Sequence, residues 1–155
     1  MPLARARCSA SLLLWARGLR PVAAVAPGVA AATGLSLQQL AAALVGQLRP
    51  AAVVCVDSLC SAEGQRLGRT VQFSDSGLYP AQADHTRHLT RDTLGVPVVA
   101  AGIPTLMQAQ EGADLVVTPR ALDSVIAHGA ALLAGSVNRA LQPRLTVQQL
   151  CWLTG

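Results

Sequence analysis

Two aspartates follow apolar runs of this sequence, and together they could perform acid–base chemistry. Asp57 ends the run AAVVCVD at residues 51–57, and Asp75 lies in the turn SDSG that follows the run TVQF. Two neighbouring carboxyl groups cannot both ionise cheaply, so one keeps a proton while the other draws a proton from water. Aspartic-type peptide hydrolysis requires such a pair. The sequence alone does not place the two side chains within hydrogen-bond distance.

A structural role for Asp57 is the alternative. Its carboxylate could cap a following helix over residues 58–65, and the spacing by itself favours this cap. The position after an apolar strand favours a functional role, because ligands of parallel sheets bind beyond the carboxyl ends of the strands. We expect Asp75 to lie at the carboxyl end of the next strand, as Asp57 lies at the carboxyl end of its own strand, so that both acids are at the same edge of the sheet.

The pattern of strands and helices expected around these residues predicts an α/β domain with a mostly parallel sheet. Short apolar runs rich in valine are typical of buried strands, and they alternate with segments of helical periodicity. Strands are expected at residues 21–29, 51–57, 70–73, 95–105 and 113–119.

Three helices are expected between and after these strands. The first is capped by Ser36 and stopped by Pro50. The second is long, with Thr118 as its cap and Pro119 at its first position, and it ends near Leu141. The third is short and capped by Thr146. The core-facing residues of the two larger helices are expected to be Leu37, Leu40, Ala41, Leu44, Val45, Leu48, Leu122, Val125, Ile126, Leu132 and Leu133.

Composition excludes several classes of function. All 12 basic residues are arginine, in no block of like charge and without interleaved aromatics, so no direct nucleic-acid partner is expected. The four cysteines form no C-x-x-C pair and have no histidine at ligand spacing, which predicts reduced thiols, no metal and no cofactor. No apolar stretch reaches 18 residues, so no membrane span is expected.

Hydrophobic residues make up 52% of the 155 residues and charged residues only 13%. Because that surplus leaves apolar surface to cover, we expect a homo-oligomer. Residues 1–18 are interpreted as a poorly specified leader or the start of a fragment, and residues 19–155 as a single α/β domain.

Several motifs together resemble the C-terminal half of the germination protease of spore-forming bacteria. The resemblance runs over roughly residues 20–142 and implies a three-layer α/β sandwich similar to hydrogenase maturation proteases. It also implies an aspartic-type endopeptidase in the cytoplasm of the spore core, which degrades small acid-soluble spore proteins during germination. The motifs, in order, are A-P-G-V, V-D after a strand, Q-x-S-D-x-G, D-T-L-G-V-P-V, G-x-P-T and V-T-P.

The resemblance implies that Asp57 is one of two catalytic aspartates, and that Ser74, Asp75 and Gly77 shape the substrate cleft. The family's other catalytic aspartate lies in an upstream motif that has no counterpart here, so we expect an N-terminally truncated homologue. Two alternatives follow. The chain is either an endopeptidase of spores or a non-catalytic remnant or interaction module of the same fold.

Overall fold

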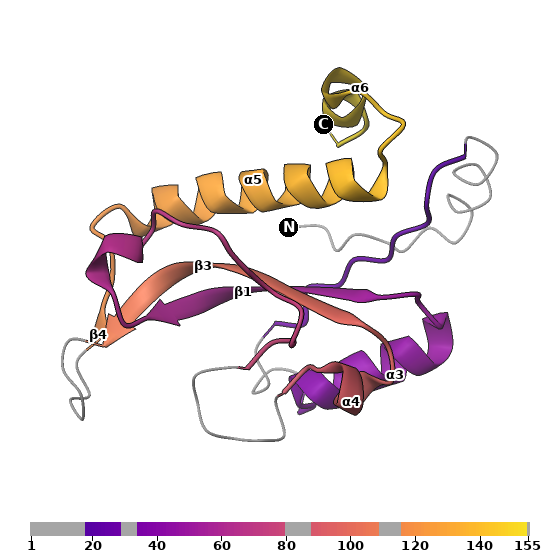
Figure 1. Ribbon diagram of the computed structural model, residues 1–155, viewed down its shortest axis with the longest axis horizontal. Helices are drawn as coiled ribbons and strands as arrows, with labels where there is room; N and C mark the ends of the chain where they lie inside the picture. Colours follow the sequence, from indigo (N-terminus) through magenta and orange to yellow (C-terminus); the bar gives the residue numbers. More distant parts are fainter. Residues whose placement is uncertain (1–17, 29–33, 80–87, 109–115, 155) are drawn as a thin grey trace. The chain divides into compact units, whose positions relative to one another are not determined.

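The computed structural model describes residues 18–28, 34–79, 88–108 and 116–154 (Figure 1). These residues belong to two compact units. The larger is formed by the part of the chain between Pro27 and Leu133, and the smaller by the segments that precede and follow it. No helix of the described residues is long and apolar enough to cross a membrane.

The larger unit is built around two long parallel strands that lie side by side in Figure 1. β1 spans Val53–Ser61 and β3 spans Val98–Gln108. Their register pairs Val53 with Val98 and continues evenly until a shift between Leu59 and Cys60. Both strands were expected, but β1 continues four residues past Asp57, where the sequence predicted a helix.

Two short strands complete the sheet, and both run antiparallel to β3. β2 (Gln72–Ser74) lies on the side of β3 opposite β1, and β4 (Val116–Val117) pairs with the end of β3. The sheet is therefore mixed, and the prediction of a mostly parallel sheet is wrong. Only a short connection, with the 3₁₀ turn Gly64–Arg66, separates β1 from β2. It returns the chain at the same end of the sheet, whereas a parallel strand would need a long crossover.

The apolar core lies on the face of the sheet that carries Cys55. Helix α3 (Leu37–Leu48) packs there, and its predicted cap is confirmed by a hydrogen bond from the Gln39 amide to Ser36 Oγ (3.2 Å). The short helix α4 (Arg91–Leu94) adds Leu94 to the same core. The core consists of Cys55, Leu78, Leu89, Leu94, Val98 and Ala100, with Leu37, Ala41, Val45, Val53, Leu59 and Val96 packed against it.

Helix α5 (Leu122–Leu141) approaches the opposite face of β3 through its first half. Gly129 faces Ile103 so closely that a Cβ on the glycine would collide with the isoleucine side chain. The predicted start of α5 at Thr118 and Pro119 is wrong, because a turn at residues 120–121 precedes the helix. The first turn of α5 instead closes through a backbone hydrogen bond from Val125 to Ala121.

The smaller unit contains the end of α5 and helix α6 (Val147–Thr154). The predicted cap of α6 is confirmed, since Gln149 N donates to Thr146 Oγ1 at 3.2 Å. The segment at residues 18–26 is held through Gln142, whose side chain exchanges two hydrogen bonds with the Arg20 backbone.

Two predictions about burial fail. Residues 21–28 of the predicted strand form no strand, and their side chains are exposed because no other strand pairs with them. Leu48 of α3 and Ile126 and Leu132 of α5 were expected to face the core, but all three are exposed. Helical spacing identifies an apolar face without showing how much of that face another element covers.

The close approach of β1 and β3 at Gly102 yields a prediction about stability. A Cβ at Gly102 would collide with the Asp57 carbonyl and approach Leu59 Cγ to 2.6 Å. We expect Gly102→Ala to lower the free energy of unfolding by about 1–3 kcal/mol because the backbone must shift. The measurement is urea denaturation followed by circular dichroism.

Gly46→Ala is the matched control, because nothing lies within 4 Å of a Cβ at this position in α3. The control should raise the free energy of unfolding by about 0.5–1 kcal/mol through its helix propensity. Equal stability of the wild type and Gly102→Ala would show that the two strands are not packed as described.

Candidate active site

Asp57 lies in the middle of β1, level with Gly102 on the neighbouring strand. Its side chain is exposed, and one carboxylate oxygen accepts a hydrogen bond from the Ser58 amide (2.8 Å). The other carboxylate oxygen takes no part in that bond. Because residues 58–61 continue the strand, the alternative in which Asp57 caps a helix over residues 58–65 is wrong.

The pKa of the Cys55 thiol depends on its burial and on the charge of the nearby Asp57 side chain. Residues two apart in a strand point to the same face, so Cys55 and Asp57 share the face covered by α3. Burial raises the pKa of the Cys55 thiol, and the negative charge of Asp57 raises it further. Asp57 therefore lies at the border between the apolar core and solvent, with its charge felt by the buried thiol.

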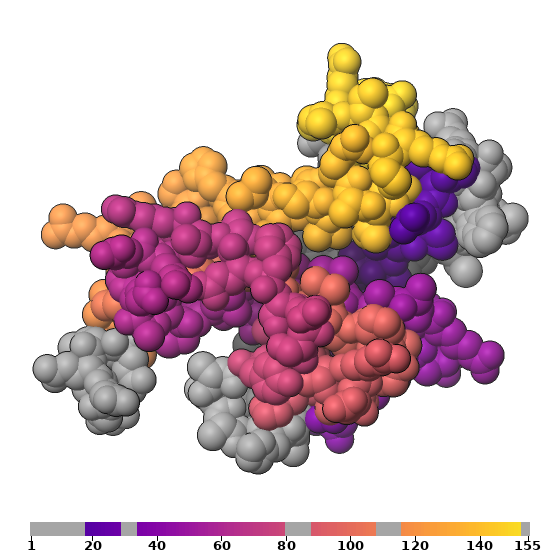
Figure 2. Space-filling model, in the orientation of Figure 1, coloured from indigo at the N-terminus to yellow at the C-terminus, as the bar shows by residue number. Residues whose placement is uncertain are grey.

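The second cluster of expected site residues forms a tight turn after β2. Ser74 Oγ lies 2.6 Å from Ser76 Oγ and accepts a hydrogen bond from the Ser76 amide (3.2 Å). Gly77 is buried with φ 105°, and a Cβ there would collide with the Leu89 carbonyl. Glycine is therefore required for backbone packing, and Figure 2 shows this turn against the segment that leads into α4.

The structure does not bring Asp57 and Asp75 together. β2 is antiparallel to β3 and pairs Ser74 with Ala100, so Asp75 lies past that pair, toward the start of β3. The expectation that both acids lie at the same edge of the sheet, each at the carboxyl end of its strand, is therefore wrong. Two strand spacings across and three residues along the sheet separate the Cα atoms by roughly 14 Å. Carboxylates this far apart cannot share a proton.

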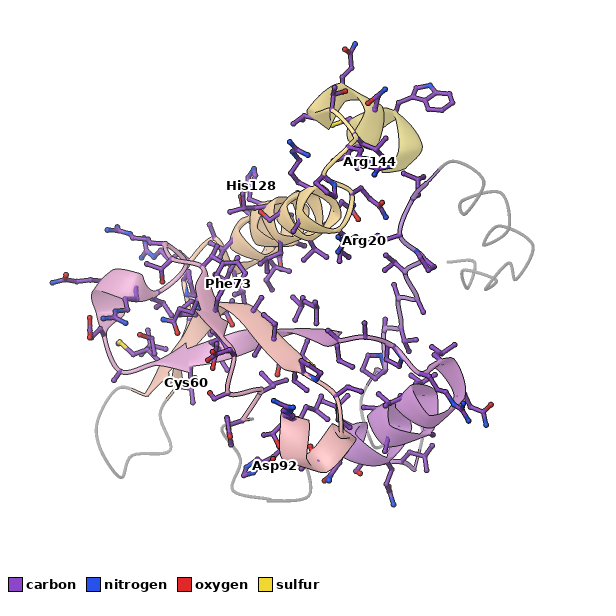
Figure 3. All side chains as sticks on the ribbon, turned by 45° about the vertical axis from the view of Figure 1, so that its right-hand side comes forward. Arg20, Cys60, Phe73, Asp92, His128 and Arg144 are labelled. Atoms are coloured by element: carbon purple, nitrogen blue, oxygen red, sulfur yellow. The ribbon has the colours of Figure 1, made fainter. Side chains whose placement is uncertain are left out.

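A cavity on the other face of the sheet was not predicted from the sequence. It has a volume of about 250 Å³ and lies between the first half of α5 and the chain just before β2. Its polar lining includes Ser124 and His128, and Figure 3 shows His128 on α5. Sequence reasoning could have found this pair from its spacing of four residues in a helix.

The Ser124–His128 pair is not a nucleophile and its base. His128 Nδ1 lies 2.8 Å from the Ser124 carbonyl and 3.1 Å from Ser124 Oγ. A carbonyl can only accept, so Nδ1 carries the proton and cannot take one from the hydroxyl. The pair stabilises the turn of the helix.

The described part of the chain contains no cluster of side chains that could bind a metal ion. No group of three or more His, Cys, Asp or Glu side chains lies close enough there to hold a metal ion. Two histidines, His85 and His88, lie between β2 and α4 in the sequence, and His88 makes an edge contact with Tyr79 (centroid distance 4.8 Å). The other, His85, lies outside the described residues.

The raised pKa of Cys55 predicts an order of thiol reactivity. The raised pKa lowers the thiolate fraction of Cys55 near pH 8, and its side chain is buried, whereas Cys60 and Cys151 are exposed to the reagent. We expect iodoacetamide to modify Cys60 and Cys151 at least about tenfold faster than Cys55, as followed by mass spectrometry of the resulting peptides.

Asp57→Asn tests the cause of this pKa shift. Removing the negative charge lowers the Cys55 pKa, so Cys55 should react faster at pH 8 than in the wild type. Because burial is the larger cause, Cys55 should still react more slowly than Cys60. Labelling of Cys55 as fast as that of Cys60 in the wild type would contradict the described core.

Comparison with known proteins agrees with the resemblance seen in the motifs. The sequence profile of the germination protease family matches residues 14–111. The chain is 37% identical to the germination protease of Halalkalibacterium halodurans over 72% of this chain and 29% of that protein. It is 28% identical to the germination protease of Clostridium perfringens strain SM101 over 85% of this chain and 55% of that protein.

A third relative, the germination protease of Bacillus licheniformis, is 33% identical over 81% of this chain and 34% of that protein. The chain thus spans between about a third and about half the length of these relatives. The match includes β1 with Asp57, the turn after β2 and the whole of β3. This chain belongs to the germination protease family.

Proposed function

We propose that this chain is an endopeptidase that degrades small acid-soluble spore proteins during germination. Asp57 supplies one of two catalytic carboxylates. The observation that carries the proposal is the family match across residues 14–111, which includes Asp57 at an exposed position beside the core. A structural role for this acid as a helix cap has no support, because β1 continues past it to Ser61.

The chemistry needs one carboxylate and one carboxylic acid on either side of a water molecule and a peptide carbonyl. The carboxylate takes a proton from the water as the water oxygen bonds to the carbonyl carbon. The carboxylic acid gives its proton to the carbonyl oxygen. The tetrahedral intermediate then breaks its C–N bond as the nitrogen accepts a proton, which releases the acid and amine products. Asp57 performs one of these two roles.

The surrounding residues support this role in different ways. Gly102 presents no side chain beside Asp57, so the backbone of β3 approaches the acid closely. The substrate cleft is shaped by Ser74, Asp75 and Gly77, which lie on the side of β3 that faces away from β1. These residues take no part in the proton transfer. Asp75 contributes charge to that cleft, not the second catalytic carboxylate.

The fold proposed for the whole of residues 19–155 is a single three-layer α/β sandwich similar to hydrogenase maturation proteases. It is supported by α3 and α4 on the Cys55 face of the sheet and by the contact of Gly129 with Ile103 on the other. The substrate class places the protein in the cytoplasm of the spore core. A homo-oligomer would cover exposed apolar side chains such as Trp152, which is 80% exposed.

The test is cleavage of a purified small acid-soluble spore protein, followed by electrophoresis and mass spectrometry. The chain is assayed alone and co-expressed with the part of the Clostridium perfringens germination protease that it does not match. We expect cleavage that Asp57→Asn lowers by about a thousandfold or more, because the proton-transfer group is lost.

Asp123→Asn is the matched control, and it should retain most of the activity because Asp123 is an exposed residue of α5, on the side of the sheet opposite the face that carries Asp57. Cleavage by Asp57→Asn at the wild-type rate would remove Asp57 from the mechanism. Absence of cleavage in both preparations would remove the protease function.

The alternative function is a non-catalytic interaction module of the same fold. It is favoured by one observation, namely that Asp75, the other acid expected at the site, lies too far from Asp57 to share its proton. A protein that binds a small acid-soluble spore protein or another subunit, and that cleaves nothing in either preparation, would have this function.

A further inference from the structure

We propose that the Gln72 carboxamide binds a peptide group of the substrate opposite Asp57, and that Gly102 leaves the space between them for this group. The inference rests on the proposed function and adds a substrate-binding residue to it. Its basis is the alignment of the three residues across the sheet, the lack of a side chain on the middle one and the hydrogen-bonding capacity of Gln72.

Asp57, Gly102 and Gln72 form one row across the strands β1, β3 and β2. The register pairs Asp57 with Gly102, and it pairs Gly102 with Gln72. Residues paired in this way point their side chains to the same face of a sheet. Gln72 therefore lies on the face that carries Asp57, whereas its neighbour Phe73 points to the opposite face.

The glycine in the middle of the row leaves a gap between the two polar side chains. Two strand spacings separate the Cα atoms of Asp57 and Gln72 by roughly 10 Å. A peptide group placed above β3 lies about 5 Å from each of the two outer strands. Both side chains can then reach it at the hydrogen-bond distance of about 3 Å. The gap thus has the width of one peptide backbone.

The floor of this gap is apolar. A Cβ at Gly102 would come within 2.6 Å of Leu59 Cγ, so the Leu59 side chain leans across the glycine. Leu59 also packs against the apolar core, whose nearest row on this face contains Cys55 and Ala100. A peptide group on this floor is partly shielded from water, and its hydrogen bonds are therefore stronger than in solvent.

The Gln72 carboxamide has no competing partner. Its nitrogen and oxygen form no hydrogen bond with any residue that the structure describes. Each buried polar side-chain atom of the described residues has a partner, so these two atoms are accessible to solvent although the side chain is half-buried. A carboxamide donates and accepts hydrogen bonds, as a peptide group does. Gln72 can therefore bind the backbone of a substrate of any sequence.

Contacts on two sides orient the reacting peptide group. With Asp57 alone, the group could rotate away from the attacking water. A second contact from Gln72 holds the carbonyl carbon in place, and such orientation makes a large contribution to rate. The carboxamide has no proton to exchange in this chemistry, so Gln72 binds the substrate and takes no part in the proton transfer.

The experiment measures the affinity of the full chain for a purified small acid-soluble spore protein by isothermal titration calorimetry. The parent is Asp57→Asn, so that the substrate stays intact. Gln72→Met keeps the length of the side chain and removes both hydrogen-bonding groups, and we expect it to weaken binding at least about tenfold. Gln72→Glu keeps the shape and the acceptor but loses the donors, and it should weaken binding about threefold or more.

Gln47→Met is the matched control, because Gln47 is an exposed residue of α3. It should change the affinity by about twofold or less. The circular dichroism spectra of all these variants should equal that of the parent, since none of the substitutions removes a hydrogen bond of the described structure.

Each outcome decides the role of Gln72. No binding by the parent, or equal binding by Gln72→Met and Gln47→Met, overturns the proposal. With Asp57 intact, Gln72→Met should lower kcat/KM at least about tenfold. An unchanged kcat/KM in this variant overturns the proposed contact and keeps the protease function. Binding that depends on Gln72, without cleavage by the wild type, supports the contact and removes the protease function.

Discussion

The parallel pairing of β1 with β3 is the constraint on which the rest of the described structure depends. It places Asp57 beside Gly102 and Cys55 beside Ala100. Glycine is the one residue type that fits at position 102, because a Cβ would collide with the Asp57 carbonyl. The same ladder divides the sheet into a face covered by α3 and α4 and a face approached by α5.

The position of Asp57 follows from this ladder and differs from that of an acid in a loop. The backbone of β1 is fixed on one side by β3, so the Asp57 carboxylate has a defined place between the core and the open edge. Asp57 lies two residues from the buried Cys55 on the same face of the sheet, so its charge raises the pKa of that thiol while the acid itself remains exposed. A rigid strand holds a reacting group more exactly in position than a flexible loop does.

Local signals in the sequence predicted local structure well. Ser36 and Thr146 each precede a glutamine by three residues, and both form the caps that this spacing indicates. The apolar runs of β1 and β3 were recognised because valine-rich segments of this length are typical of buried strands. The motifs around Asp57 and Asp75 also identified the family before any coordinates.

What the sequence could not predict depends on contacts between distant segments. The antiparallel direction of β2 follows from the short connection after β1, and it separates Asp75 from Asp57. Thr118 and Pro119 have the residue types of a helix start, but the chain makes a further turn before α5. Among the described residues, 21–28 of the expected strand 21–29 pair with no other strand, and an apolar run without a pairing partner forms no strand.

The most direct test of the account is the amide exchange of β1 in the isolated chain, resolved residue by residue by NMR. β1 is the outermost strand of the described sheet, which predicts fast exchange at Val56, whose amide faces away from β3, and slow exchange at Cys55, whose amide faces β3. Equal protection of the two amides would contradict the account, because it would mean that the edge beside Asp57 is already occupied.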